Sequence, residues 1–376
     1  MDDDDGPPPY RKGTVLFIQP HKVSTPDEAR AYVPTSDEEK LMLTERWRDR
    51  VESVFRFPAP QPAQPEVTGS PKQLRVTRIL AGGQCHGPQV VVCTLAGASG
   101  SDRVYVAKIY DPLYYKHPTE RWRPSDPPNT LCKYAHLHYT SESAAYERIE
   151  ANKQSRPGPC TADYFGSWCF QVSKSSSRKK DNTPPARPRE RTVCLILTEY
   201  VKGKSMAEVA TEKDRGYRVQ NFERLNETCR LYVWSRLLEA ETWLEHIGVR
   251  HADLLERNVM LHPPPALDDN SASAAELRPQ VVIIDFDRAQ LGPGTLIQGL
   301  PPSPIVKWWH EFPGDIISWS PEWWTSELPR RRRWLLAEFG KGNRGKYQRY
   351  NGLCDVDTLT EVDKDFLQNI SYTKWR

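Results

Sequence analysis

The sequence predicts an α+β fold in which a small β-rich part precedes a mainly helical part. Short runs rich in Val, Ile and Leu, separated by Gly- and Ser-containing turns, recur between residues 73 and 201 and are typical of strands. A long stretch with apolar residues at helical spacing follows over residues 225–247. Six of the twelve Trp lie between residues 308 and 334, and such clusters usually belong to a packed core. We therefore expect a bilobal chain with a β-rich N-lobe and a helical C-lobe.

The composition is that of a globular protein and excludes several classes. With 376 residues, of which 38% are hydrophobic and 27% charged, the chain is long enough for one large two-lobed domain and an extension. The net charge of +3 is too small to indicate nucleic-acid binding. No apolar run approaches the ~18 residues that a membrane helix needs. We expect neither a nucleic-acid nor a membrane partner.

Two further features favour a cytoplasmic or nuclear location. The first nine residues are acidic and Pro-rich, unlike a secretory signal peptide. The eight Cys are scattered and form no Cys-x-x-Cys pair, which favours free thiols in a reducing compartment. His136 and His138 form the only close His pair, and we expect no metal there because no ligand partners accompany them at a useful spacing.

Residues 1–72 are predicted to form an N-terminal extension that is partly disordered and contains one helix. The helix is expected over residues 36–54, where Ser36 can cap it and acidic residues follow in the first turn. Residues 58–71 are Pro-rich and predict a linker. Residues 14–18 are apolar and predict one short strand that docks on the rest.

Strands dominate from residue 73. Residues 74–80 predict one strand, and residues 89–95 and 103–110 predict a hairpin. Gly83 and Gly87 frame the turn between the first strand and the hairpin. On its own this is an ordinary turn.

Lys108 lies in the middle of the second hairpin strand, between apolar residues. A buried ammonium group is costly unless a partner compensates its charge, whereas a Lys at a strand edge can extend to solvent. A helix predicted over residues 141–149 offers two carboxylate partners. We favour Glu142 over Glu147.

The remaining elements separate the two parts and build the second. Residues 163–172 and 193–198 predict strands, and the basic, Ser- and Pro-rich residues 173–192 between them predict a solvated loop. The helix over residues 225–247 is expected to end at Gly248. Residues 261–280 then predict a flexible insert, and the four Arg at 330–333 predict a solvated basic patch.

The residues that carry chemistry lie in two short motifs after the long helix. Residues 249–258 read Val-Arg-His-Ala-Asp-Leu-Leu-Glu-Arg-Asn, which places Asp253 five residues before Asn258. The apolar residues 281–284 predict a buried strand that leads into Asp285. Phosphoryl transfer uses such a set: one carboxylate orients the attacking hydroxyl, while an amide oxygen and a second carboxylate bind Mg²⁺. The alternative is that these residues only form turns.

The order of these motifs resembles the protein-kinase-like superfamily, and in particular a fungal group of protein-kinase-like proteins. The spacing of Asp253 and Asn258 is similar to that of the catalytic loop, and residues 285–287 are similar to the metal-binding Asp-Phe-Gly. Residues 106–109, Val-Ala-Lys-Ile, resemble the Val-Ala-Ile-Lys element. The resemblance implies a bilobal protein-kinase-like fold with its N-lobe at 73–201 and its C-lobe at 202–376.

The resemblance also implies ATP and Mg²⁺ as cofactors and a role for each site residue. Asp253 would be the catalytic base, and Arg257 would supply a cation to the transferred phosphate. Asn258 and Asp285 would bind Mg²⁺. The nucleotide would be held by Lys108 paired with Glu142, by a phosphate-covering loop at Gly83 and Gly87, and by the hinge backbone of Glu199 and Val201.

Several positions depart from the family pattern. Ala252 stands where regulated kinases have an Arg that binds activation-loop phosphate, so we expect no such switch. Leu255 replaces the Lys of Ser/Thr kinases, and Asp287 replaces the Gly of Asp-Phe-Gly. Three functions stay open: an ATP-dependent phosphotransferase with a protein or small-molecule acceptor, a pseudokinase that serves as a binding scaffold, and a small-molecule kinase of the aminoglycoside or choline type.

Overall fold

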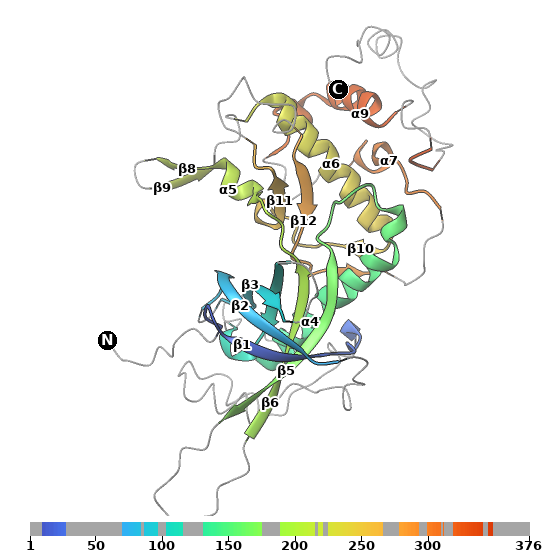
Figure 1. Cartoon of the computed structure of the whole chain (residues 1–376). Coiled ribbons are helices and arrows are strands. Elements are labelled where there is room, and N and C mark those ends of the chain that lie inside the picture. The colour runs from blue at the N-terminus through green and yellow to red at the C-terminus, as the bar shows by residue number, and fades with distance from the viewer. Residues whose placement is uncertain are drawn as a thin grey trace, which may run out of the picture. The chain divides into compact units, whose positions relative to one another are not determined.

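The computed structural model shows a chain of two compact units (Figure 1). Unit 1 contains the described residues of 1–147 and 163–200, and unit 2 those of 148–162 and 201–376. The described residues are 10–27, 70–83, 86–96, 103–115, 131–174, 189–214, 217–220, 225–265, 278–292, 299–309, 311, 319–340 and 345–348. The chain thus has the predicted mixture of strands and helices.

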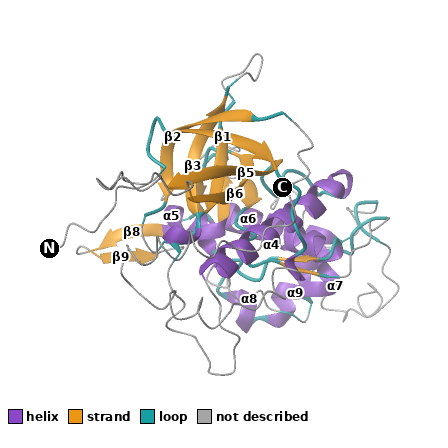
Figure 2. Cartoon of the chain, turned by 90° about the horizontal axis from the view of Figure 1, so that it is seen from below, coloured by secondary structure: helices purple, strands orange, loops and turns teal. Residues whose placement is uncertain are grey.

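Unit 1 is a closed six-stranded barrel with one long helix, and its strands appear together in orange in Figure 2. The strands are antiparallel to their neighbours in the order β1-β2-β3-β4-β6-β5, and β1 also pairs with β5. Their bounds are β1 (Val15–Pro20), β2 (Lys72–Ala81), β3 (Gln89–Leu95), β4 (Tyr105–Tyr110), β5 (Tyr164–Lys174) and β6 (Arg189–Glu199). The predicted hairpin and flanking strands are confirmed.

The first strand closes the barrel. Val15 to Ile18 pair with β2, and Gln19 and Pro20 pair with Cys169 and Trp168 of β5. The strand predicted over residues 14–18 is therefore confirmed, and it contributes to the core through the fully buried Ile18. The helix predicted over residues 36–54 and the Pro-rich linker at 58–71 lie outside the described residues, except for the last two positions of the linker.

The helix of unit 1, α4 (Leu131–Ala151), begins ten residues earlier than predicted. The sequence pattern over residues 131–140 is not amphipathic, because polar side chains such as Lys133 and His138 are buried alongside Ala135 and Tyr139. A helix that buries polar groups lacks the apolar stripe by which such elements are recognised. The division between the two units falls within this helix, after Glu147.

The basic stretch after β5 was predicted too long. β5 extends to Lys174 and β6 begins at Arg189, so both strands take residues from the expected loop at 173–192. Arg191, predicted to be solvated, is buried and forms a two-pronged ion pair with Asp111, with distances of 2.6 Å and 2.8 Å. Such a planar pair satisfies both buried charges at once. Residues 175–188 lie outside the described part of the chain.

Unit 2 combines helices with short strands. The helices are α5 (Met206–Ala210), α6 (Glu227–His246), α7 (Pro304–Trp308), α8 (Trp323–Ser326) and α9 (Leu328–Phe339). The strands are β7 (Lys204–Ser205), β8 (Thr211–Asp214), β9 (Tyr217–Gln220), β10 (Val249–Arg250), β11 (Val259–His262), β12 (Gln280–Ile283) and β13 (Gln290–Leu291). They pair as β12-β11-β7, β10-β13 and β8-β9.

The long helix α6 leads directly to the motif at 249–258, as predicted. Asn226 caps its start by accepting the N–H of Thr228 at 2.9 Å. Gly248 follows its end with φ of 72°, a backbone conformation that suits Gly. The predicted insert at 261–280 is shorter than expected, because its two ends pair with each other in β11 and β12. Residues 266–277 lie outside the described part.

The Trp-rich stretch packs as predicted, but the basic patch beside it does not. The buried indoles in this stretch are Trp308, Trp309, Trp319, Trp323 and Trp324. Arg331, expected in solvent with the other Arg of 330–333, is almost fully buried, and its Nη2 donates to the carbonyl of Trp309 at 2.9 Å. The patch prediction is wrong at this position because Arg331 lies on the face of α9 that the indoles cover.

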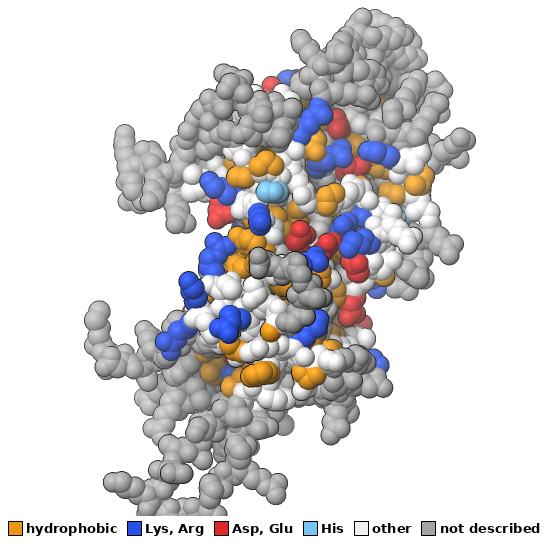
Figure 3. Space-filling model, in the orientation of Figure 1, with side chains coloured by type: hydrophobic (Ala, Val, Ile, Leu, Met, Phe, Trp, Pro, Cys, Tyr) orange, Lys and Arg blue, Asp and Glu red, His pale blue; other side chains and the backbone are white. Residues whose placement is uncertain are grey.

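Basic, acidic and apolar side chains are interspersed on the face that Figure 3 shows. Among the described residues the most exposed large apolar side chain is Phe17 of β1, with 70% of its surface accessible. No helix among the described residues is long and apolar enough to cross a membrane.

Candidate functional site

Lys108 and Glu142 form a buried ion pair in unit 1. The Nζ of Lys108 lies 2.6 Å from the Oε2 of Glu142, and both side chains are buried. The hydroxyl of Tyr110 donates to the same oxygen at 2.5 Å. The choice of Glu142 over Glu147 is confirmed, since Glu147 is exposed.

The pair follows from the apolar environment of β4. Lys108 lies between the fully buried Ala107 and Ile109, and its neighbours across the sheet are Val90 and Ile196. An ammonium group held there needs a carboxylate, because desolvation without a partner is costly. Strand periodicity places Tyr110 on the same face as Lys108, so its contribution could have been found in the sequence.

The turn that contains Gly83 and Gly87 is held by a side chain that sequence reasoning missed. Both glycines have positive φ, 117° and 97°. The amide of Gln89, itself buried, accepts the N–H of Gly83 at 2.7 Å and donates to the carbonyls of Gly83 and Gly87. The backbone of this turn is therefore bonded to protein, and Gln84 and Cys85 lie outside the described residues.

The two predicted hinge residues lie at the end of β6 and just beyond it. The N–H of Glu199 donates to the carbonyl of Asp163 at 2.8 Å, and its carboxylate accepts the N–H of Asp163 at 3.3 Å. The carbonyl of Val201 accepts the N–H of Gly203 at 3.0 Å. These bonds fix the course of the chain where β6 ends.

In unit 2 the motif at 249–258 folds into a loop that bonds to itself. The Nδ2 of Asn258 donates to the backbone carbonyl of Asp253 at 2.8 Å. Arg257 forms an ion pair with Asp253, in which Nη2 and Oδ2 are 2.7 Å apart. The side chain of Asn258 is buried, and its other end, the amide oxygen Oδ1, is the atom suited to a metal ion.

His251 connects this loop to the segment that follows β12. Its Nε2 lies 3.0 Å from the carbonyl of Ile284, and its Nδ1 accepts the N–H of Asp253 at 3.3 Å. Burial lowers the pKa of His251, opposed by its bond to Ile284 and by nearby acids. A neutral imidazole that donates through Nε2 and accepts at Nδ1 fits both contacts. The sequence motif contains this His, but its role as a connector comes only from the fold.

Backbone strain occurs at two positions, one in the loop at 249–258 and one in the segment that follows β12. Ala252 has φ of 60° and Asp285 has φ of 70°, and they are the two described non-Gly residues with positive φ. Such conformations cost energy and persist where surrounding bonds impose them. Here the N–H of Ile284 donates to the carbonyl of Asn258 at 2.9 Å. The adjoining strands β11, which follows Asn258, and β12, which precedes Ile284, pair with each other.

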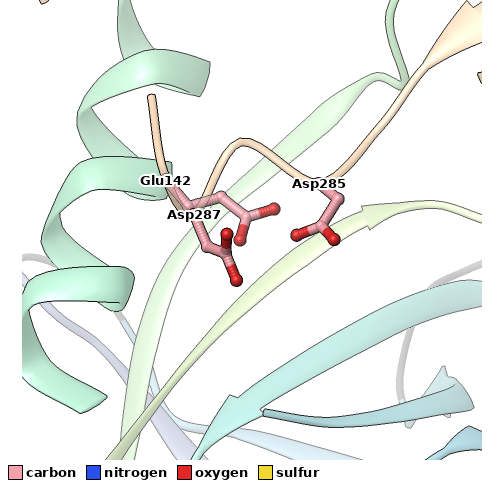
Figure 4. A group of neighbouring side chains, drawn as sticks. All are labelled: Glu142, Asp285 and Asp287. Carbon is pink, nitrogen blue, oxygen red and sulfur yellow. The ribbon is translucent and has the colours of Figure 1, made fainter. Parts of the chain in front are cut away.

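Asp285 and Asp287 supply two carboxylates from the segment after β12 (Figure 4). Their oxygens lie within 4.8 Å of each other. Like charges this close favour a cation between them. Carboxylate and amide oxygens are hard ligands of the kind that Mg²⁺ prefers, so the chemistry of Asp285, Asp287 and Asn258 suits that ion.

The structure thus groups the predicted site residues by unit. Unit 1 brings Lys108 and Glu142 into contact. Unit 2 brings Asp253, Arg257 and Asn258 into one loop and connects that loop to the backbone just before Asp285.

Comparison with known proteins gives little more. No protein-family model matches the chain, and no curated protein matches it. Among solved structures, the crystal structure of the BubR1 kinase domain matches with 13% sequence identity and a TM-score of 0.34. The match covers 66% of this chain and 60% of the BubR1 chain. At this level of similarity the likeness supports no assignment.

Proposed function

We propose that the chain is an ATP- and Mg²⁺-dependent phosphotransferase of the protein-kinase-like type, with a β-rich N-lobe and a mainly helical C-lobe. One observation in unit 2 carries the proposal. The loop at 249–258 and the segment after β12 are hydrogen-bonded to each other, and each contains a strained backbone position. Asn258 and Asp285 are held by a shared set of backbone bonds, and Asp285 keeps a positive φ that costs energy. Strain of this kind is concentrated at functional sites.

The proposal gives each charged group one role. Lys108, oriented by Glu142, would contact the phosphates of ATP. Asn258 and Asp285 would bind Mg²⁺, which neutralises charge on the phosphates when it is bound. Asp253 would orient the acceptor hydroxyl and take its proton. Arg257 reaches Asp253 and so is suited to supply positive charge beside the transferred group.

The test is Mg²⁺-dependent ADP production by the purified chain, with and without added acceptors. Asp253→Asn should lower the rate by ~10²–10⁴, the usual cost of losing a positioned base. Its affinity for Mg-ATP should stay at the wild-type value, because the carboxylate contacts the acceptor. Glu256→Gln, which removes a carboxylate from the same loop, is the control and should retain the rate. Wild-type protein that binds no Mg-ATP would refute the proposal.

One observation favours a second candidate, a pseudokinase that binds partners without catalysis. Gln89 already occupies the N–H of Gly83, a donor that a phosphate-covering loop would offer to ATP. Wild-type protein that binds Mg-ATP, yet shows no turnover that Asp253→Asn reduces, would favour this candidate. Gln89→Ala would then be expected to tighten nucleotide binding by releasing that donor.

A further inference from the structure

Residues 10–27, here called the N-terminal strap, run along unit 1 and are fixed at several points. At one end the hydroxyl of Tyr10 donates to the Oδ2 of the buried Asp111 at 2.7 Å. Next the N–H of Gly13 donates to the carbonyl of Val76 at 2.8 Å. β1 then forms the barrel strand that lies between β2 and β5. The strap is therefore part of the core of unit 1.

The far end of the strap bonds to helix α4. The Nδ1 of His21 lies 2.7 Å from the hydroxyl of Tyr139, and the Oγ of Ser24 lies 3.1 Å from the Nε2 of His136. His21 and Tyr139 are both buried. Two successive turns of α4 thus each receive one side chain from the strap.

These contacts lie directly beside Glu142. Tyr139 precedes Glu142 by three residues, about one helical turn. On the other side of Glu142, the hydroxyl of Ser143 accepts from the Oγ of Ser167 in β5 at 2.9 Å. The carbonyl of Ser167 in turn accepts the N–H of His21 at 3.0 Å. Strap, β5 and α4 form a closed ring of bonds around the turn that carries Glu142.

We infer that the strap positions Glu142, with His21 as the positioning residue that acts through Tyr139. The pair between Lys108 and Glu142 requires α4 to stay where its oxygen is 2.6 Å from the ammonium group. Removing the His21 contact leaves the buried hydroxyl of Tyr139 with Ser167 but without the imidazole, and this loss of one buried hydrogen bond favours movement of the helix. The inference rests on the proposed function, because it assigns the strap control over the residue that orients Lys108 toward ATP.

A direct test measures how fast Lys108 reacts with an amine-specific ester, read by mass spectrometry without nucleotide. Tyr139→Phe and His21→Ala should raise labelling of Lys108 about fivefold or more, the equilibrium effect of losing one buried hydrogen bond. Lys307, paired with Glu241 in unit 2, is the internal reference and should not change. His21→Asn, which restores a polar atom near the position of Nδ1, should return labelling toward the wild-type rate.

The matched control is Phe17→Ser, a change in the same strap at a side chain that is 70% exposed. It should leave labelling of Lys108 unchanged. Equal labelling in His21→Ala and Phe17→Ser would overturn the inference, and so would a parallel rise at Lys307, which would show general loosening. Because labelling needs no ATP, the outcome stays separate from the proposed function: a wild type without Mg-ATP binding would refute only the latter. Where Mg-ATP does bind, His21→Ala should weaken its affinity and His21→Asn should restore it.

Discussion

The two units differ in the charged side chains that they bring together at the candidate site residues. Unit 1 contains two buried ion pairs, Lys108 with Glu142 and Arg191 with Asp111. In unit 2 two carboxylates, Asp285 and Asp287, lie within 4.8 Å of each other. The first arrangement joins opposite charges, whereas the second brings like charges together, a grouping that a cation would stabilise.

The difference shows which unit depends on a ligand. In the buried pair of Lys108 and Glu142 each charge offsets the other, and removing one of them takes a close counter-charge from the other. In the carboxylate pair of unit 2, Asp285 has a positive φ, a backbone conformation that costs energy. Unit 1 should therefore respond to loss of a partner, and unit 2 to addition of a metal-bound nucleotide.

The largest expected effect is the loss of one partner in unit 1. Glu142→Gln should lower the free energy of unfolding by about 3–5 kcal/mol, because the buried ammonium group of Lys108 then loses the carboxylate that lies 2.6 Å away. Denaturant unfolding measures this difference. Glu147→Gln, on the exposed side of the same helix, should change stability by less than about 0.5 kcal/mol. Equal effects in the two variants would contradict the ion-pair account.

The second largest effect should appear when the pH is lowered, and it concerns the imidazole of His136 in unit 1. Burial, aided by the neighbouring His21, lowers the pKa of His136 from 6.5 to about 4. The unfolded chain then binds more protons than the fold between these values. The contribution of the uncharged His136 to the free energy of unfolding is fully present above pH 6.5. It is lost as the pH falls toward 4, by about 3 kcal/mol in total.

The measurement compares wild type with His136→Gln by urea unfolding between pH 7 and pH 4. The stability of the wild type relative to the variant should fall steadily over that range. Ser24→Ala removes the hydrogen bond to His136 but keeps the imidazole, so it should retain the wild-type pH slope. A variant with the same slope as wild type would show that His136 does not carry the acid sensitivity.

In unit 2 the third effect should appear on addition of ligand. Mg-ATP at about 100 times its dissociation constant should stabilise the fold by roughly 2–3 kcal/mol. Asp285→Asn should remove the metal-dependent part in a thermal melt, and Asn tolerates the positive φ at this position. Glu227→Gln, an exposed carboxylate at the start of α6, should keep the full response. A full response in Asp285→Asn would remove this residue from the metal site.

Local pattern and chemistry predicted the contact between Lys108 and Glu142 and singled out the candidate residues of unit 2. Lys108 stands out because an ammonium group in an apolar strand demands a partner, and the nearest helix offers Glu142. Asp253, Asn258 and Asp285 follow from their spacing and from the apolar run before the last of them. Each of these signals lies within one element or between two adjacent ones.

What the sequence did not reveal depends on contacts between distant residues. Arg191 and Asp111 are 80 positions apart, and a basic, Pro-rich neighbourhood made solvent the natural expectation for Arg191. Arg331 was missed for the same reason, since only the fold shows that indoles cover it. The strap contact between His21 and Tyr139 joins residues 118 positions apart, and no periodic pattern in the sequence predicts it.

The smallest effect concerns strain itself. Ala252 has φ of 60°, where an L-residue pays roughly 1–2 kcal/mol and Gly does not. Ala252→Gly should therefore stabilise the fold by about 0.5–1 kcal/mol after the extra chain entropy of Gly is subtracted. Ala289→Gly, at a buried Ala of the same unit that lacks a positive φ, should destabilise it. Denaturant unfolding distinguishes the two signs. If Ala252→Gly is more stable but transfers phosphate more slowly, the strain at Ala252 keeps Asp253 in its working position. Unchanged stability would mean that the loop carries no strain for catalysis to use.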